Sequence, residues 1–199
     1  MTLLIATTNP GKLKEIAAIL GRLPITLNTL KDFPVVEVAE ETGSPFAENA
    51  KQKALHYANA TGMLTMAEDS GFEVDALNGE PGIYSARYLR PDASYAERFD
   101  AIYQSVREKQ ARSAATNAAR FVCALALAGR GNVIFETTGV VEGALAPKPV
   151  GTGGFGYDPI FFYPPYGRTF GEVTPDQKLV VSHRGEAIRA LKAHLERNL

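Results

Sequence analysis

Two neighbouring acids, Glu68 and Asp69, follow a short apolar segment, residues 64–67. That segment is typical of a buried strand, so we expect the strand to end where the two acids begin. A second acidic pair, Glu40 and Glu41, lies in a predicted loop. Carboxylates that meet beyond a core strand suit hard cations such as Mg²⁺, which prefer oxygen ligands. The pattern indicates a magnesium site, with two solvated acidic turns as the equally weighted alternative.

A possible phosphate site lies near the start of the chain, where a strand-like segment is followed by Thr7, Thr8, Asn9, Pro10, Gly11 and Lys12. Asn9 can cap a helix, and Pro10 suits its first position. Backbone N–H groups at a helix start attract anions, and Lys12 adds a positive charge. It is not a Walker loop, because Ala6 and Leu13 stand where that motif has Gly and Ser or Thr. A capped helix with a solvated lysine is the alternative.

A glycine-rich segment, residues 151–159, contains the spacing G-x-G-x-x-G. Strand-like residues 160–162 follow it instead of a helix, so we reject a dinucleotide-binding fingerprint. An aromatic side chain in such a loop can still stack on a planar base. Farther on, Lys178 and residues 182–185 offer donors for carbonyl or phosphate oxygens. Capping of the last helix by Ser182 explains the second segment equally well.

A predicted helix over residues 44–62 places Asn49, Lys53 and His56 on one face. Polar faces of this kind are usually only solvated, so the face by itself carries no functional prediction. The single cysteine, Cys123, lies in an apolar run and is expected to be a buried, unreactive thiol.

These residues must be positioned by helices and strands in alternation. We expect strands at residues 3–6, near 26–27, at 35–38, 64–67, 120–128 and 132–142, and helices at 10–21, 44–62, 93–110 and about 185–197. The link 129–131 between the last two strands predicts an antiparallel hairpin. This mixture predicts an α/β fold with a mixed sheet.

Composition fits a soluble globular domain. The chain has 199 residues, 45% hydrophobic and 22% charged, and one cysteine, so it needs no disulfide to fold. A formal net charge of −1 disfavours broad nucleic-acid binding. With neither a signal peptide nor a long apolar segment in the sequence, we expect a cytoplasmic protein.

Seven segments together resemble the inosine triphosphate pyrophosphatase family, which includes the dITP/XTP pyrophosphatases. They are residues 7–12, 46–50, 53–54, 69–71, 81–87, 153–159 and 182–185, in the order of the family and over nearly the whole chain. Two positions depart from the common pattern. Thr8 stands where bacterial members commonly have Gly, and Glu68 where many have Asp.

The resemblance implies an elongated α/β fold: a mixed central sheet flanked by helices, in a single domain over residues 1–199 with two lobes and a substrate cleft between them. It also implies a homodimer. The implied reaction is hydrolysis of non-standard purine nucleoside triphosphates (ITP/dITP and XTP/dXTP) to the monophosphate and pyrophosphate, which keeps them out of DNA and RNA.

The resemblance also assigns roles to residues. Asp69 would be the general base, and Mg²⁺ would bind to Asp69 with Glu40 or Glu41. The triphosphate would contact Lys53, Ser70 and the segment of Thr7, Thr8, Asn9, Pro10, Gly11 and Lys12. The base would be bound by Phe155, Gly156, Tyr157, Asp158, Lys178, His183 and Arg184. Lys178 and Arg184 suit the carbonyl at position six of hypoxanthine and xanthine, where adenine carries an amino group.

Three alternatives remain open at this stage. One is a Maf-like nucleotide pyrophosphatase, although residues 9–12 depart from the Arg-rich turn of that family. Another is a nucleotide sensor that binds without hydrolysis. The third, a nucleic-acid-binding module, conflicts with the net charge and with carboxylates beside a phosphate site.

Overall fold

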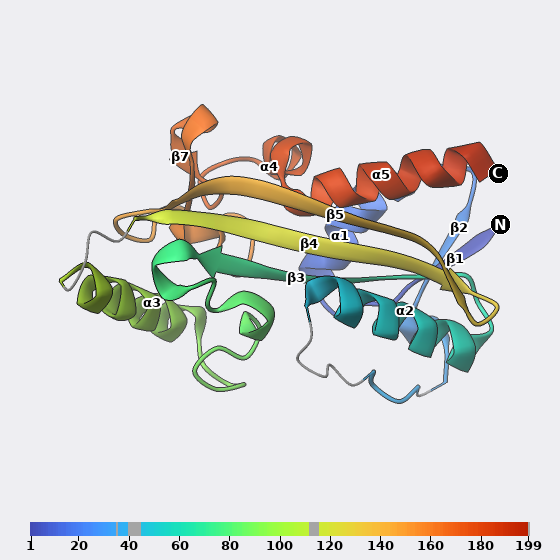
Figure 1. The fold of residues 1–199 in the computed structure, drawn as a ribbon. Helices are drawn as coiled ribbons and strands as arrows, with labels where there is room; N and C mark the ends of the chain where they lie inside the picture. Colours follow the sequence, from blue (N-terminus) through green and yellow to red (C-terminus); the bar gives the residue numbers. More distant parts are fainter. Residues whose placement is uncertain (35, 40–44, 112–115, 199) are drawn as a thin grey trace. The chain divides into compact units, whose positions relative to one another are not determined.

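The described strands form one mixed sheet. The computed structural model describes residues 1–34, 36–39, 45–111 and 116–198. Within them, seven strands follow the order β2-β1-β3-β4-β5-β6-β7 (Figure 1). β1 pairs in parallel with β2 and β3, whereas β6 pairs antiparallel with β5 and β7. The predicted α/β fold with a mixed sheet is therefore confirmed.

The elements have the following bounds. The strands are β1 (Thr2–Ile5), β2 (Thr26–Thr29), β3 (Thr65–Val74), β4 (Ala118–Gly129), β5 (Asn132–Leu145), β6 (Phe161–Tyr163) and β7 (Arg168–Thr169). The α-helices are α1 (Pro10–Leu20), α2 (Phe46–Thr61), α3 (Tyr95–Gln110), α4 (Pro175–Val181) and α5 (His183–Asn198). No helix in the described part of the chain is both long enough and apolar enough to cross a membrane.

The chain divides into two compact units, each with its own hydrophobic core. Unit 1 comprises residues 1–69, 123–139 and 182–199, and unit 2 comprises residues 70–122 and 140–181. β3, β4 and β5 contribute residues to both units. The single domain over residues 1–199 stays a prediction.

In unit 1, helices cover both faces of the sheet. α1 and α5 pack together on one face, and α2 lies on the other (Figure 1). Ile16 and Leu20 of α1 share the core with Ile188 and Leu191 of α5 and with strand residues such as Leu125. These apolar contacts hold each helix on one face of the sheet, so the polar side chains that the helix also directs at the sheet reach it from that face.

Local signals identified the capping residues of α1 and α5. Asn9 caps α1, and its Oδ1 accepts hydrogen bonds from the backbone N–H groups of Gly11 and Lys12. Ser182 Oγ accepts from the N–H of Gly185 at 3.1 Å, which confirms the predicted cap of α5. These caps fix where α1 and α5 enter the site.

The hairpin prediction is also confirmed. β4 and β5 are hydrogen-bonded neighbours, joined by Arg130 and Gly131 with φ of 52° and 79°. Two consecutive positive φ values are typical of the turn that joins antiparallel strands tightly.

Three expectations about the elements were wrong. β3 does not end at the acids but continues to Val74, because Phe72 and Val74 are completely buried and maintain the strand. Residues 36–38 form no strand, and Val38 is 82% exposed; Val35 lies outside the described residues. α4 was not expected at all, and α5 begins at His183, two residues before its predicted start.

A substitution at Gly139 tests how closely β5 approaches α5. A Cβ there would lie 2.1 Å from the carbonyl oxygen of His183 and 3.0 Å from the amide nitrogen of Ala187. We expect Gly139→Ala to lower the free energy of unfolding by about 2–3 kcal/mol, since helix backbone cannot yield as a side chain would. The exposed neighbour Thr138→Ala should change it by less than about 0.5 kcal/mol. Equal urea denaturation midpoints for the two variants would contradict this packing.

Candidate active site

Glu68 and Asp69 are consecutive residues of β3, and both are only 5% exposed. Side chains of consecutive strand residues point to opposite faces of a sheet. Accordingly, Glu68 contacts residues of α1 and α5, and Asp69 contacts residues of α2. The two acids therefore belong to two different polar clusters of unit 1.

The Asp69 cluster consists of Asp69, Asn49 and Lys53. Asn49 Nδ2 donates to Asp69 Oδ2 at 2.9 Å, and Lys53 Nζ lies 3.4 Å from Asp69 Oδ1. Asn49 and Lys53 are four residues apart in α2, so they share one face. The expectation of a solvated face was wrong for Asn49, which is 1% exposed.

The Glu68 cluster joins α1, β3, β4 and α5. Lys12 Nζ lies 2.7 Å from Glu68 Oε1, and Arg184 Nη2 lies 3.6 Å from Glu68 Oε2. Arg184 also donates through Nη1 to Glu15 Oε2 at 2.6 Å. Cys123 Sγ donates to Glu68 Oε2 at 3.3 Å. Two cations and two carboxylates thus balance one another inside unit 1.

The charges in the Glu68 cluster hold one another ionised. Burial alone raises the pKa of Glu68, but the positive charges of Arg184 and Lys12 outweigh it, so the pKa lies well below the usual 4.5. Burial lowers the pKa of Arg184, but Glu68 and Glu15 outweigh it and raise the pKa above the ordinary value. Burial, then the charge of Glu68, raises the pKa of Cys123 well above its usual range, which confirms a buried, protonated thiol.

In the predicted phosphate segment, several donors already have partners. The N–H groups of Gly11 and Lys12 donate to Asn9 Oδ1, and the N–H of Asn9 donates to Thr7 Oγ1 at 3.2 Å. Thr8 and Pro10 are exposed. A phosphate bound here would compete with Asn9 for backbone donors and with Glu68 for Lys12.

Unit 2 brings Phe155, Asp158 and Lys178 together. Asp158 Oδ2 accepts from Lys178 Nζ at 2.7 Å and from the backbone N–H of Phe155, also at 2.7 Å. Lys178 Nζ lies 4.4 Å from the centre of the Phe155 ring. Asp158 and Lys178 are 1% and 3% exposed, whereas Phe155 is half-buried. The result is an aromatic ring held beside a buried cation.

The remaining predicted residues lie elsewhere. Tyr157 lies in the core of unit 2, where it stacks on Phe72 and donates to the carbonyl of Ser85. Ser70 follows Asp69 in β3 and is half-buried, as is Gly156. His183 is buried at the start of α5 in unit 1, beside Arg184. The roles of these residues in binding stay predictions.

The predicted metal ligands are only partly described, because Glu40 and Glu41 lie outside the described residues. In the described ranges, no group of three or more His, Cys, Asp or Glu residues is placed to hold a metal. The Asp69 cluster does supply a hard oxygen donor, the Asp69 carboxylate. That donor chemistry fits a cation such as Mg²⁺.

Two residues of these clusters received no role from the sequence. Glu15 is half-buried against Arg184, and its position three residues after Lys12 on one helix face was its only signal. Asn49 was recognised in a motif and on a polar helix face, but neither pattern showed that it contacts Asp69.

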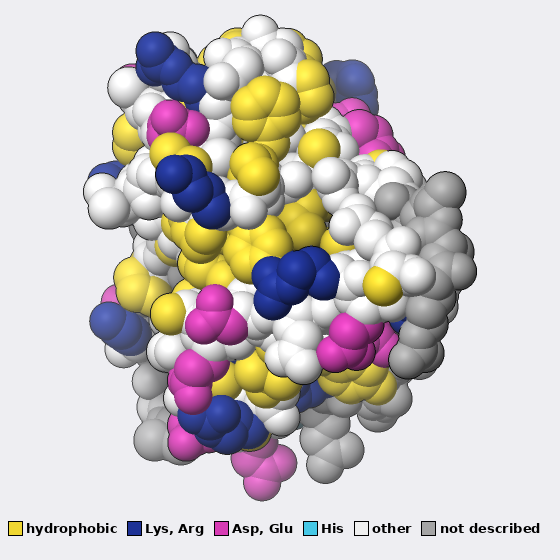
Figure 2. Space-filling model, turned by 90° about the vertical axis from the view of Figure 1, so that its left-hand side faces the viewer, with side chains coloured by type: hydrophobic (Ala, Val, Ile, Leu, Met, Phe, Trp, Pro, Cys, Tyr) yellow, Lys and Arg dark blue, Asp and Glu magenta, His cyan; other side chains and the backbone are white. Residues whose placement is uncertain are grey.

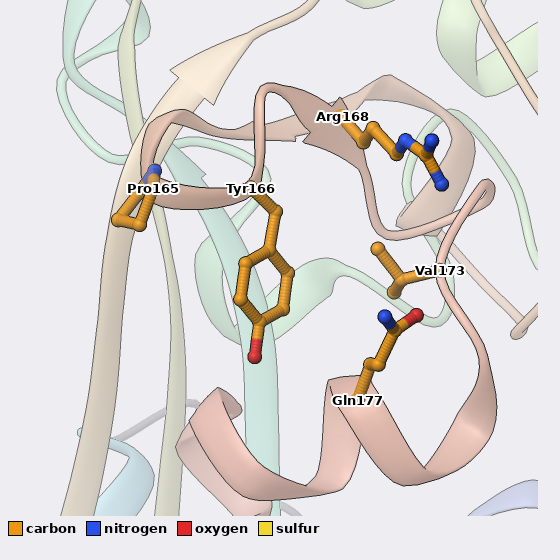
Figure 3. A pocket seen from close by; sticks show the side chains of 5 residues that line it. All are labelled: Pro165, Tyr166, Arg168, Val173 and Gln177. Carbon is orange, nitrogen blue, oxygen red and sulfur yellow. The ribbon is translucent and has the colours of Figure 1, made fainter.

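A separate open hollow of about 360 Å³ lies in unit 2 (Figure 3). It is lined by Pro165, Tyr166, Arg168, Val173 and Gln177, none of which was predicted as a site residue. All of these except Val173 are exposed. Because this lining has no buried polar group, the Asp69 cluster is the stronger candidate for chemistry.

Comparison with known proteins finds relatives over nearly the whole chain. The family model described as the Ham1 family matches residues 3–194. A protein of Geobacter sulfurreducens named dITP/XTP pyrophosphatase is 47% identical over 97% of this chain and 96% of its own. One of the same name from an Exiguobacterium species is 42% identical over 98% and 97%. The solved structure of a HAM1 protein from Coxiella burnetii is similar with a TM-score of 0.90 and 37% identity, over 99% of both chains.

The low pKa of Glu68 predicts a pH-dependent contribution to stability. We expect Glu68→Gln to lower the free energy of unfolding by about 3–5 kcal/mol near neutral pH, because Arg184 and Lys12 lose a buried partner. Since the pKa of Glu68 lies below 4.5 in the folded protein, its contribution is complete above that pH and declines as the pH falls below it.

Urea unfolding at about pH 7 and pH 3 measures this effect. The difference in the free energy of unfolding between wild type and Glu68→Gln should be smaller at the lower pH. Glu196→Gln, which removes an exposed partner of Lys192, should cost less than about 1 kcal/mol at both pH values. If the difference in the free energy of unfolding between wild type and Glu68→Gln were the same at both pH values, the proposed stabilisation of ionised Glu68 by Lys12 and Arg184 would be wrong.

Proposed function

This chain belongs to the Ham1 family, and from that premise we propose that it hydrolyses non-standard purine nucleoside triphosphates, ITP/dITP and XTP/dXTP, to the monophosphate and pyrophosphate. The near-complete matches to relatives named dITP/XTP pyrophosphatase support the substrate class and favour this family over the Maf-like alternative. The observation that carries the proposal is the buried Asp69 carboxylate, held between Asn49 and Lys53. Removing such nucleotides from the pool keeps them out of DNA and RNA.

In the proposed reaction, Asp69 accepts a proton from a water molecule. The oxygen of that water bonds to the α-phosphorus, and the bond from the α-phosphorus to the oxygen bridging to the β-phosphorus breaks. Pyrophosphate leaves with the electrons of that bond. Lys53, already beside Asp69, supplies positive charge for the phosphate oxygens.

The phosphate chain would also meet the start of α1 and the Lys12 ammonium. Because Glu68 pairs with Lys12, it orients the lysine without satisfying all three of its N–H donors. Asp69, with Glu40 or Glu41, would hold Mg²⁺. When bound, the metal offsets phosphate repulsion and increases the acidity of a coordinated water. Enzymes of this class commonly use a divalent metal, which supports this part of the proposal.

Recognition of the base is assigned to Phe155, Asp158 and Lys178, with His183 and Arg184. Phe155 offers a ring for stacking, and Lys178 offers a donor to a carbonyl at purine position six. Adenine has an amino group there, so the Lys178 donor would be left unpaired, which costs about 1–3 kcal/mol. The ion pair with Asp158 holds the Lys178 side chain in place.

A homodimer, a cytoplasmic location and the absence of nucleic-acid binding complete the proposal. The family resemblance supports the first two. The net charge of −1 supports the third. On the face drawn in Figure 2, the described Lys and Arg side chains are interspersed with Asp and Glu instead of forming a continuous basic surface, which also supports it.

Replacing the proposed base tests the reaction. Asp69→Asn should reduce hydrolysis of ITP and XTP by at least about 100-fold, because the amide accepts no proton from water. Products are identified by anion-exchange chromatography with Mg²⁺ present. Wild type should give monophosphate and pyrophosphate and act slowly on GTP and ATP. Inorganic phosphate as the first product would contradict the proposed bond, and binding of ITP without hydrolysis by wild type would indicate a sensor.

Replacing Lys178 tests base recognition. Lys178→Met should lower kcat/KM for ITP by about 10–100-fold and change it less for ATP, so the preference for ITP shrinks. Gln177→Ala, at the preceding exposed residue of α4, is the matched control and should keep the preference. An unchanged ratio of ITP to ATP activity in Lys178→Met, with a normal melting temperature, would exclude Lys178 as a specificity residue.

A further inference from the structure

The Asn49 amide has one end paired and the other unpaired. Asn49 is 1% exposed, and its Nδ2 donates to Asp69 Oδ2 at 2.9 Å. Its Oδ1 is buried and accepts no hydrogen bond from any residue that the structure describes. A buried acceptor without a donor lowers the stability of the folded protein. The side chain is therefore retained at a cost to stability.

The surroundings of Asn49 in α2 do not require a polar residue. The other buried residues of this helix are Phe46, Ala50, Ala54, Tyr57 and Ala58. An apolar side chain of similar volume would fit this setting without an unsatisfied oxygen. The polar contact that Asn49 does make is with Asp69, so its role lies with that carboxylate.

The geometry restricts how the Asp69 carboxylate can turn. An ionised carboxylate only accepts hydrogen bonds, so the NH₂ end of Asn49 faces Asp69 and the oxygen end faces away. Lys53, one helical turn further along α2, contacts the other carboxylate oxygen at 3.4 Å. Two groups of one rigid helix therefore hold both oxygens of Asp69 and set the plane of the carboxylate.

We infer that Asn49 is a positioning residue for hydrolysis, acting through Asp69. By fixing the carboxylate plane, it keeps Asp69 oriented toward the attacking water, and its own Oδ1 stays ready for a donor that arrives with the substrate. A small loss of alignment of a reacting group costs up to about 100-fold in rate. The inference rests on the proposed role of Asp69 as the base.

The test separates positioning from folding. Asn49→Leu keeps the branched shape of the side chain and removes both ends of the amide, and its melting temperature is measured to show that the variant folds. Its kcat for ITP should fall by about 10–100-fold, while KM changes by less than about threefold. Affinity for a non-hydrolysable α,β-methylene analogue of ITP should also change by less than about threefold. Asn49→Ala should give the same division between kcat and KM at a lower melting temperature, because it leaves a cavity.

Gln52→Ala is the matched control, because Gln52 lies one turn from Asn49 in α2 and bonds to Glu48 of the same helix. It should keep kcat. A kcat in Asn49→Leu equal to that of wild type or of Gln52→Ala would overturn the inference. A rise in KM alone would also overturn it, because Asn49 would then serve substrate binding. Failure of both Asn49 variants to fold would overturn it as well, because Asn49 would then serve the fold.

A double variant shows whether Asn49 acts through Asp69. Asn49→Leu combined with Asp69→Asn should be no slower than Asp69→Asn alone, because a positioning residue has nothing left to position. Additive losses would show that Asn49 acts independently and would contradict the inference. If Asp69→Asn alone kept its activity, the proposed base would be wrong whatever Asn49 does, so the two failures are distinguishable.

Discussion

Burial of two adjacent carboxylates in one strand is the constraint on which unit 1 depends. β3 alternates its side chains, so Glu68 and Asp69 cannot share a single cation from one helix. Each acid needs positive or donating groups from the face that it enters, since an unpaired buried charge is far too costly. α1 and α5 meet that need on one face and α2 meets it on the other. The positions of all three helices are therefore tied to a two-residue segment.

The two acids consequently differ in what they can do. Glu68 is enclosed with Lys12, Arg184 and Glu15, a balanced set that keeps its charge through a low pKa. In the proposed function, such a group orients the lysine expected to bind phosphate and has little tendency to take up a proton. Asp69 is contacted by the amide of Asn49 and the ammonium of Lys53, and it is the acid proposed to accept the proton. The direction of each side chain thus separates the proposed roles of two residues that are neighbours in sequence.

The same principle applies in unit 2 to the residues proposed to recognise the base. Asp158 accepts from both Lys178 and the backbone of Phe155, so one carboxylate fixes the donor and the aromatic ring together. A prearranged pair of this kind loses little conformational entropy when a planar ligand binds. The ion pair also gives the Lys178 side chain a partner at 3% exposure.

The sequence by itself determined the features that depend on neighbouring residues. Asn9 and Pro10 marked the start of α1, residues 129–131 marked the hairpin, and the ordered motifs marked the family. Their physical basis is local: caps, turns and periodicity act over a few residues.

Only the tertiary structure decided which helix each acid meets. Glu68 and Asp69 resembled a turn in sequence, yet they lie inside β3, because Phe72 and Val74 beyond them are buried by distant segments. Asn49 resembled part of a solvated face, and Glu15 gave no functional signal. Their partners are 20 and 169 residues away in the chain. Burial and pairing over such separations are set by packing, which local sequence patterns do not encode.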